Sequence, residues 1–300
     1  MDIRPGFVGL GVMGGPMAGH VLAKYGSLVA FDVDAERSRL LRDKGAEIAG
    51  GVADVGSRAN AVVLSLPGSG IVREVVLGTD GLASTLEEGS VVIDTSTTEP
   101  TVSREIGKAL AERGIRFLDA PVSGGEKAAI DGTLSIMVGG DQFTFDDCLE
   151  LLETMGTTVV RVGDVGAGEV AKMVNQIIVG ATFAIVAEGF ALGTKSGLDP
   201  AVLYEAIRNG WAGSKVLDVA VPAMLDRNFK PGGTVNIHWK DLGYSLSLAK
   251  DSDVPTPVTA IVHEVFKAAR AAGDGPLSQP AIVLLWERLL GVEVTERTVR

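Results

Sequence analysis

The chain has 300 residues, a formal net charge of −11 and a sequence pI of about 4.8. Such an acidic chain repels phosphate backbones and anionic headgroups, so its composition argues against a nucleic-acid partner. Its length predicts two domains, because one domain usually holds about 100 to 200 residues. Cys148 is the single cysteine, which excludes an internal disulfide and favours a buried thiol in a reducing, cytoplasmic setting.

No segment of the sequence is predicted to cross a membrane. The first residues, 1–9, carry no basic patch before a long apolar run, so we expect a strand there instead of a signal peptide. The most apolar stretch, 177–187, is interrupted at Glu188 and is shorter than the roughly 18 to 20 residues of a bilayer span. We therefore expect no membrane contact.

In the first half of the chain, short β-branched runs alternate with longer amphipathic stretches. This pattern predicts βα units around a mainly parallel sheet. The predicted strands are residues 3–8, 28–32, 61–66, 91–94, 116–119, 134–138 and 158–162. The predicted helices are residues 16–25, 35–44, 71–77, 101–113 and 143–155, several of which are followed by glycine or another turn residue.

The first predicted strand leads into a glycine-rich turn of the form GxGxxG. Its residues are Gly9, Leu10, Gly11, Val12, Met13 and Gly14. Gly9 suits the tight turn, Gly11 lets the backbone approach a pyrophosphate, and Gly14 allows close packing of helix on strand. The N–H groups at the start of the helix attract the phosphates. A bare strand-to-helix turn is the alternative for this motif by itself.

Asp32 ends the second predicted strand, where an acidic side chain accepts hydrogen bonds from the ribose hydroxyls and repels a 2′-phosphate. Arg37 and Arg39 follow on the next helix and are interpreted as solvated charges, although either would soften that preference if it faced the ribose. NAD is therefore the predicted cofactor, and NADP the less favoured one.

Two further strand ends point toward the same crevice, because ligands of open α/β sheets bind beyond the carboxyl ends of the strands. Leu66 and Pro67 follow one strand, and Ser96 and Thr97 follow the next. Pro67 offers a rigid wall to a nucleotide, and the two hydroxyls offer donors to the nicotinamide or its ribose. Read without their context, these are ordinary turn residues.

A hydroxyl and two glycines follow the strand 116–119. Ser123, Gly124 and Gly125 can form a concave nest of N–H groups for a carboxylate, with the serine Oγ as a further donor. The alternative is a plain glycine-rich turn before a helix. This turn is the first candidate for a substrate contact.

After Gly163 the alternation stops, and residues 165–196 are predicted to form one long helix that joins the two domains. Residues 177–187 are apolar almost all round, so we expect burial on every side, with a partner subunit supplying part of the cover. The predicted fold class is α/β: a Rossmann-type dinucleotide-binding domain over residues 1–163, then an all-α substrate and oligomerisation domain over residues 164–300. A homodimer or homotetramer is expected.

Lys172 and Asn175 lie one turn apart on this helix, so their side chains share a face, and Gln176 flanks them. A partly buried lysine loses hydration, which would lower its pKa toward the range useful for proton transfer. A solvated lysine at a helix end is the alternative. The three histidines show no ligand spacing, so no metal is predicted.

Four motifs in order resemble the β-hydroxyacid dehydrogenases, the family that includes 3-hydroxyisobutyrate dehydrogenase, and the resemblance covers essentially the whole chain. They are Gly9–Gly14 with Met17 and Ala18, Asp119–Gly125 continuing into Gly132–Leu134 and Met137–Gly140, Gly166–Gly168 with Lys172 and Asn175, and Lys240–Leu242. The resemblance implies that Lys172 is the catalytic acid and base, that Asn175 helps to hold the substrate, and that Ser123 to Gly125 bind its carboxylate. It also implies cofactor contacts at Leu66, Pro67, Thr97 and Lys240.

The implied reaction is hydride transfer between NAD and a small 3-hydroxy acid. Within the family, segments 123–126, 212–214, 225–232 and 291–295 resemble the enzymes that reduce tartronate semialdehyde to glycerate, which implies this reaction. Oxidation of 3-hydroxyisobutyrate or another short 3-hydroxy acid is the alternative. Trp211, if it lies near the pocket, would disfavour long or branched acids. A non-catalytic dinucleotide-binding scaffold and an imine reductase are the competing classes, and both are disfavoured by Lys172.

Overall fold

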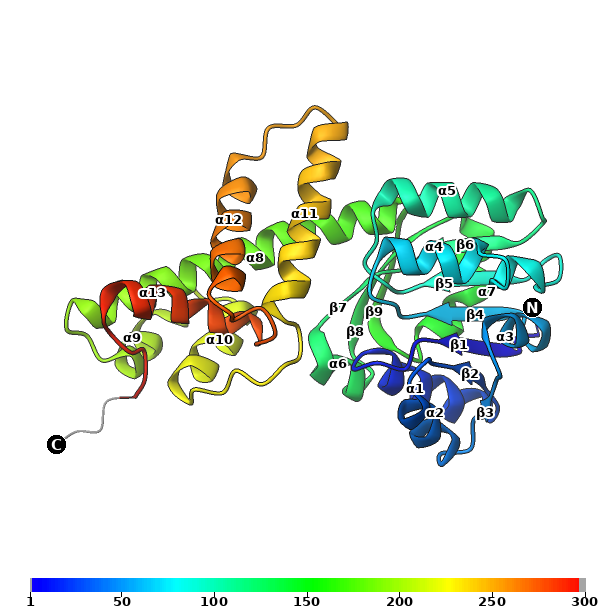
Figure 1. The fold of residues 1–300 in the computed structure, drawn as a ribbon, viewed down its shortest axis with the longest axis horizontal. Coiled ribbons are helices and arrows are strands. Elements are labelled where there is room, and N and C mark those ends of the chain that lie inside the picture. The colour runs from blue at the N-terminus through cyan, green and yellow to red at the C-terminus, as the bar shows by residue number, and fades with distance from the viewer. Residues whose placement is uncertain (1, 297–300) are drawn as a thin grey trace. The chain divides into compact units, whose positions relative to one another are not determined.

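The structure is a computed structural model that describes residues 2–296. The chain forms two compact units, of which the first ends at Lys172 and the second begins at Met173 (Figure 1). The first unit is built around a sheet and the second is helical, which confirms the predicted fold class. The division between units falls inside the long helix α8 (Ala167–Lys195), later than the boundary predicted after residue 163.

The sheet of the first unit is mainly parallel. Its order is β3-β2-β1-β4-β5-β6-β8-β7, and β9 pairs with β8. The strands are β1 (Pro5–Val8), β2 (Val29–Phe31), β3 (Glu47–Ile48), β4 (Ala61–Leu64), β5 (Val91–Asp94), β6 (Arg116–Asp119), β7 (Val122–Ser123), β8 (Leu134–Gly139) and β9 (Gly156–Gly163). Pairing is parallel from β3 through β6, whereas β8 runs antiparallel to β6 and β7. The order reverses between β1 and β4, and this switch point is where such sheets bind ligands.

Helices connect the strands and cover both faces of the sheet. They are α1 (Gly14–Tyr25), α2 (Ala35–Arg42), α3 (Val52–Arg58), α4 (Ser69–Leu77), α5 (Pro100–Ala111), α6 (Gly125–Asp131) and α7 (Gln142–Leu152), with a 3₁₀ turn η1 (Leu82–Ser84). Every predicted strand and helix of this unit is present. The elements that the sequence pattern missed are β3, β7, α3 and α6, which are too short to show a hydrophobic period.

Alternate residues of the central strands enter two separate cores, as the period of two requires. Val63 and Ile93 pack in one core with α1 and α7, whereas Val62 and Val92 pack in the other with α3, α4 and α5. Cys148 lies fully buried in the first core, where burial raises the pKa of its thiol to about 11. The expected buried thiol is thus confirmed.

The second unit contains only helices among its described residues. After α8 come α9 (Pro200–Ile207), α10 (Lys215–Leu225), α11 (Val235–Asp251), α12 (Pro257–Ala271), the 3₁₀ turn η2 (Gln279–Ile282) and α13 (Val283–Leu290). Their core includes Phe190, Met224 and Phe266. The predicted single long helix over residues 165–196 is confirmed by α8.

In the single chain α8 is buried on only part of its surface, and the cover expected from a partner subunit stays a prediction. Phe183 and Phe190 are buried, but Ile178, Ile185 and Leu192 are 61%, 61% and 64% exposed. The three exposed residues are spaced by seven, so they form one stripe on the helix. By length and composition α8 is also apolar enough to cross a membrane, a property that core helices of soluble proteins share. The expected absence of membrane contact therefore stays a prediction.

Candidate active site

The glycine loop between β1 and α1 has the geometry that its three glycines predict. Gly9 has a φ of +95°, and a Cβ there would collide with the Ser65 carbonyl oxygen. A Cβ on Gly14 would collide with the Gly9 carbonyl. At Gly11, by contrast, a Cβ would meet only Arg37 Nη1, at 3.4 Å, which leaves the backbone approachable. No side chain caps the start of α1, so its first N–H groups suit a pyrophosphate.

Asp32 ties the end of β2 to this glycine loop. Its Oδ2 accepts a hydrogen bond from the Leu10 N–H at 2.6 Å, and its Oδ1 accepts one from the Asp34 N–H at 2.7 Å. A carboxylate has about four lone-pair sites, so these two bonds leave acceptor capacity for ribose hydroxyls. Asp32 thus shapes the loop in addition to its predicted role toward the ribose.

The two arginines after β2 differ in their surroundings. Arg39 forms ion pairs with Glu36 at 2.6 Å and with Asp43 at 2.8 Å on the exposed face of α2, as predicted for a solvated charge. Arg37 pairs with Asp34 at 3.2 Å and also lies beside Gly11. Arg37 is therefore the cation that stands next to the predicted cofactor loop.

The ends of β4 and β5 are joined by a side chain. Ser96 Oγ accepts a hydrogen bond from the Leu66 N–H at 2.9 Å, and Ser96 is buried. This contact fixes the main chain at Leu66, the residue before Pro67. Ser96 thus positions the neighbouring strand end, and the direct cofactor contact predicted for it, as for Thr97, stays a prediction.

Lys172 meets the turn that follows β6. Its Nζ donates a hydrogen bond to the Val122 carbonyl oxygen at 2.7 Å, and the lysine is only 6% exposed. The next residues are Ser123, Gly124 and Gly125, and the two glycines have φ values of +136° and +71° that favour glycine. Within the first unit, the structure therefore brings the predicted acid and base against the predicted carboxylate nest.

Asp119, at the end of β6, holds the first turn of α8. Its carboxylate accepts hydrogen bonds from the Gly166 N–H at 2.7 Å and from the Glu169 N–H at 3.0 Å. Cβ atoms at Gly139 or Gly168 would collide with Asp119. Burial raises the pKa of Asp119 to about 6, against the opposing effect of these N–H groups. The sequence placed Asp119 in the anion turn and missed this role, because its partners lie 47 and 50 residues away.

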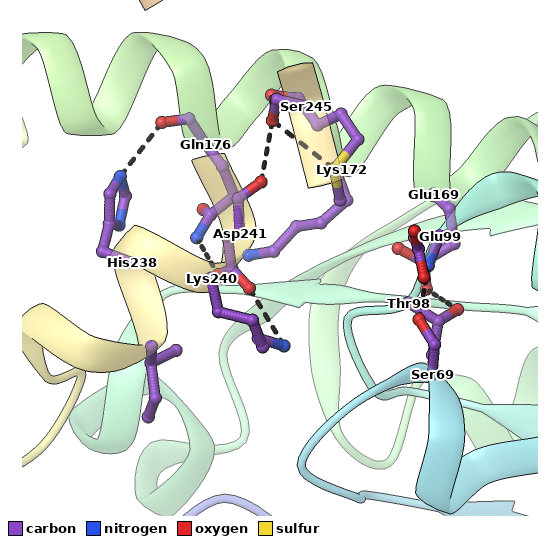
Figure 2. Close-up of polar contacts among 12 residues, drawn as sticks. Ser69, Thr98, Glu99, Glu169, Lys172, Gln176, His238, Lys240, Asp241 and Ser245 are labelled. Carbon is purple, nitrogen blue, oxygen red and sulfur yellow. Dashed lines mark hydrogen bonds and ion pairs between the residues drawn. The ribbon is translucent and has the colours of Figure 1, made fainter. Parts of the chain in front are cut away.

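Glu169 is a second buried acid in this turn. It is fully buried, and its Oε1 accepts a hydrogen bond from Thr98 Oγ1 at 3.1 Å (Figure 2). Burial, followed by the charges of Asp94 and Asp119, raises the pKa of Glu169 well above its usual range. Glu169 thus favours its protonated form. No periodicity in the sequence distinguished it from a solvated first-turn glutamate.

In the second unit, Asn175 and Lys240 belong to one polar network, of which Figure 2 labels Gln176, Lys240 and Asp241. Asn175 Nδ2 donates to Gln176 Oε1 at 2.9 Å, and Gln176 Nε2 donates to Asp241 Oδ2 at 2.6 Å. Lys240 Nζ lies 3.1 Å from Asp241 Oδ1. Sequence reasoning named Asn175 and Lys240 but missed Gln176 and Asp241, which connect them.

The structure also bears on the expectations for Trp211 and for a metal site. Trp211 is fully exposed in the single chain, and its narrowing of a pocket stays a prediction. Within residues 2–296, no three His, Cys, Asp or Glu side chains gather in a group that could hold a metal ion.

A parallel sheet with an open glycine loop at its switch point, followed by a helical unit, defines a dinucleotide-dependent oxidoreductase. Residues 4–163 match the NAD binding domain of 6-phosphogluconate dehydrogenase, and residues 166–286 match the NAD-binding domain of NADP-dependent 3-hydroxyisobutyrate dehydrogenase. The chain therefore has an NAD(P)-binding domain, and it belongs to the β-hydroxyacid dehydrogenase family.

Individual relatives agree with this assignment. The chain is 35% identical over 295 residues to 2-(hydroxymethyl)glutarate dehydrogenase of Eubacterium barkeri, covering 98% of each chain. It is 35% identical over 281 residues to 2-hydroxy-3-oxopropionate reductase of Escherichia coli (strain K12), covering 94% of this chain and 96% of the relative. The solved structure of 3-hydroxyisobutyrate dehydrogenase from Salmonella typhimurium superposes with a TM-score of 0.87 at 29% identity, covering 95% of this chain and 100% of that one. The resemblance read from the motifs is confirmed.

Proposed function

We propose that this enzyme transfers a hydride between NAD and a short 3-hydroxy acid, with the reduction of tartronate semialdehyde to glycerate as its leading reaction. The observation that carries the proposal is the buried Lys172 ammonium, whose Nζ lies 2.7 Å from the Val122 carbonyl beside Ser123, Gly124 and Gly125. A proton donor and an anion nest thus stand side by side in one unit. Bound NADH would supply the hydride for reduction.

Lys172 provides the proton for the substrate oxygen. In reduction, its ammonium stabilises the negative charge that develops on that oxygen and then transfers a proton to it. In oxidation, neutral Lys172 takes the proton from the hydroxyl group. The Val122 carbonyl, which accepts a hydrogen bond from Nζ, holds the ammonium at the turn. This fixed position supplies part of the orientation that the reaction needs.

The substrate carboxylate is assigned to Ser123, Gly124 and Gly125. Both glycines have positive φ values, so their N–H groups can converge on an anion in a way that residues with a Cβ seldom allow. No side chain caps the start of α6, which leaves its first N–H groups for the ligand. The reacting carbon then lies β to the carboxylate, within reach of Lys172.

The relatives support a chemical class of substrate, but they do not distinguish among the individual acids of that class. One is named for 2-hydroxy-3-oxopropionate and another for 2-(hydroxymethyl)glutarate, and both are 35% identical to this chain. Both compounds have an oxidisable or reducible carbon β to a carboxylate, and they differ in the substituent between the two. A short 3-hydroxy acid such as 3-hydroxyisobutyrate is the alternative substrate.

The test compares kcat/KM for each acid with that for its methyl ester. Loss of the carboxylate charge should cost roughly 1.5 to 3 kcal/mol, or more than about tenfold in kcat/KM. Glycerate, 3-hydroxypropionate, 3-hydroxyisobutyrate and 2-(hydroxymethyl)glutarate form the panel, with glycerate expected to be preferred. Equal turnover of an acid and its ester would show that Ser123, Gly124 and Gly125 do not bind the substrate carboxylate.

NAD is proposed as the preferred cofactor because Asp32 stands at the ribose end of the glycine loop. Its carboxylate would repel a 2′-phosphate, whereas Arg37, beside Gly11, would attract one. Asp32 accepts a hydrogen bond from the Leu10 N–H of the loop on one oxygen and from the Asp34 N–H on the other, so its charge is fixed in place. NADP is the less favoured alternative.

We also propose a homodimer or homotetramer in the cytoplasm, without a nucleic-acid or membrane partner. The exposed stripe of Ile178, Ile185 and Leu192 on α8 supports self-association, because stripes of large apolar side chains favour protein contacts. The net charge of −11 opposes binding to nucleic acid or anionic lipid. Light scattering at micromolar concentration should give at least twice the chain mass of 31.1 kDa, and a monomer would refute the assembly.

A further inference from the structure

Gln176 stands between an acid and the predicted substrate residue. It is 7% exposed, and its carboxamide is engaged on both sides. Nε2 donates to Asp241 Oδ2 at 2.6 Å (Figure 2), and Oε1 accepts from Asn175 Nδ2 at 2.9 Å. Asp241 is itself 1% exposed. All three residues belong to the second unit, so the network stands within one compact body.

The chemistry of the three groups fixes the direction of every hydrogen bond. An ionised carboxylate can only accept, so Gln176 must turn its amino group toward Asp241. Its carbonyl Oε1 must then face Asn175, and Asn175 must turn its own amino group toward Gln176. The polarity of two amide groups, which each could otherwise flip, thus follows from one carboxylate.

The main chain at Gln176 is held from a second direction. Gln279 Nε2 donates to His238 Nδ1 at 3.1 Å, so the ring proton belongs on Nε2, which then donates to the Gln176 carbonyl oxygen at 3.1 Å. His238 is fully buried and stacks on Phe266 with ring centroids 4.9 Å apart. Gly180 leaves room for this ring, because a Cβ there would collide with it. Gln176 is therefore fixed at both its backbone and its side chain.

Lys240 holds the other oxygen of Asp241. Its Nζ lies 3.1 Å from Asp241 Oδ1, on the side of the carboxylate that Gln176 does not use. The network thus runs from the Lys240 ammonium through the Asp241 carboxylate and the Gln176 amide to the Asn175 amide.

We propose that Gln176 is a positioning residue that sets the polarity of the Asn175 carboxamide. With its amino group directed to Gln176, Asn175 presents Oδ1 on the opposite branch of the amide. That oxygen accepts a hydrogen bond from a substrate hydroxyl, which selects acids that carry a hydrogen-bond donor. The inference rests on the proposed function, in which Asn175 helps to hold a 3-hydroxy acid.

The test exchanges the two groups. Gln176→Glu places two carboxylates face to face, and Asp241→Asn removes the group that fixes the amide direction. The double variant Gln176→Glu with Asp241→Asn restores the order, because the amide introduced at position 241 donates to the carboxylate introduced at position 176. That carboxylate also accepts from Asn175, as the Gln176 carbonyl does in the wild type. The double variant keeps the net charge of the wild type.

Each single variant should lower kcat/KM for the best 3-hydroxy acid at least about tenfold, the effect of about one lost charged hydrogen bond, mainly through a higher KM. The double variant should return to within about threefold of the wild type, a deviation from additivity that contacting residues show. The far-ultraviolet circular dichroism spectrum should stay unchanged in all three variants, which reports that the chain remains folded.

A matched exchange on the surface is the control. Gln142 Nε2 donates to Asp146 Oδ1 at 2.7 Å at an exposed position of α7. Gln142→Glu, Asp146→Asn and their double variant repeat the same chemistry outside the network and should leave kcat/KM at the wild-type level. They separate the effect of position from that of added charge.

The outcomes distinguish the proposed function from the inference about Gln176. An inactive wild type on the whole acid panel removes the proposed function and this inference with it. An active wild type with wild-type kcat/KM in Asp241→Asn, or with a double variant as impaired as the product of its single variants, overturns the inference and leaves the proposed function standing. Recovery in the double variant supports both.

Discussion

Buried acids serve different purposes in the two units. In the first unit, Asp119 accepts hydrogen bonds from the main-chain N–H groups of Gly166 and Glu169 and so fixes the start of α8. In the second, Asp241 accepts a hydrogen bond from the side chain of Gln176 and, through it, directs Asn175. The first carboxylate holds a backbone and the second orients side chains. Loss of the first should therefore affect both stability and catalysis, whereas loss of the second should affect substrate binding.

Lys172→Ala is expected to give the largest effect. It should lower kcat by about 10² to 10⁴, the usual contribution of a general acid and base. NADH affinity should remain near the wild-type value, because Lys172 acts on the substrate oxygen. Single-turnover kinetics and fluorescence titration separate the two quantities. Wild-type turnover in this variant would refute the role of Lys172, and Lys127→Ala, an exposed lysine paired with Asp131, is the control.

Asp119→Asn tests the acid that holds the backbone at the start of α8. An asparagine cannot accept on both sides, so one main-chain N–H of the α8 turn loses its partner, at a cost of about 1 to 3 kcal/mol in the free energy of unfolding. Because Lys172 follows on the same turn, kcat should also fall, by about tenfold or more. Urea unfolding and steady-state kinetics measure both. A rise in KM alone, with an unchanged free energy of unfolding, would show that Asp119 and Asp241 do not play different roles.

Asp32→Ala should narrow the preference for NAD over NADP. The substitution removes a charge that repels a 2′-phosphate and leaves Arg37 beside the loop. We expect the ratio of kcat/KM for NADH over NADPH to fall about tenfold or more, the effect of one charged contact. Arg37→Ala should shift the ratio in the opposite direction. A wild type that uses NADPH better than NADH would show that Asp32 does not set the preference.

Glu169→Gln should give the smallest effect and one that depends on pH. The pKa of Glu169 in the folded chain is raised above 4.5. As pH rises from that value toward the raised pKa, the unfolded state loses its proton first, so the stability of the wild type falls. Glutamine cannot ionise, so the melting temperature of the variant relative to the wild type should rise between pH 5 and pH 9. A constant difference across this range would show that folding does not raise the pKa of Glu169.

The parts of the fold and site that the sequence predicted are local ones. Gly9, Gly11 and Gly14 act through the turn in which they occur, and a period of two or 3.6 identifies a strand or helix within its own residues. The contacts that the sequence did not predict join distant positions. Gly166 lies 47 residues from Asp119, and Gln176 lies 65 residues from Asp241. Those pairs follow only from the order of the strands and the packing of α11.

The partial exposure of α8 in the single chain has the same physical origin. Its apolar composition predicts burial but does not say which face another helix covers. The structure buries Phe183 and Phe190 and leaves Ile185 exposed.

The central claim is that the chain reduces a semialdehyde that carries a carboxylate, with Lys172 as the proton donor. The direct measurement is the loss of NADH absorbance at 340 nm with tartronate semialdehyde, with a cyclic imine as the competing substrate. The account predicts rapid NADH oxidation with the semialdehyde, little with the imine, and a collapse of the first rate in Lys172→Ala. Oxidation with the imine only would contradict the claim in favour of an imine reductase, and silence with both would indicate a dinucleotide-binding scaffold.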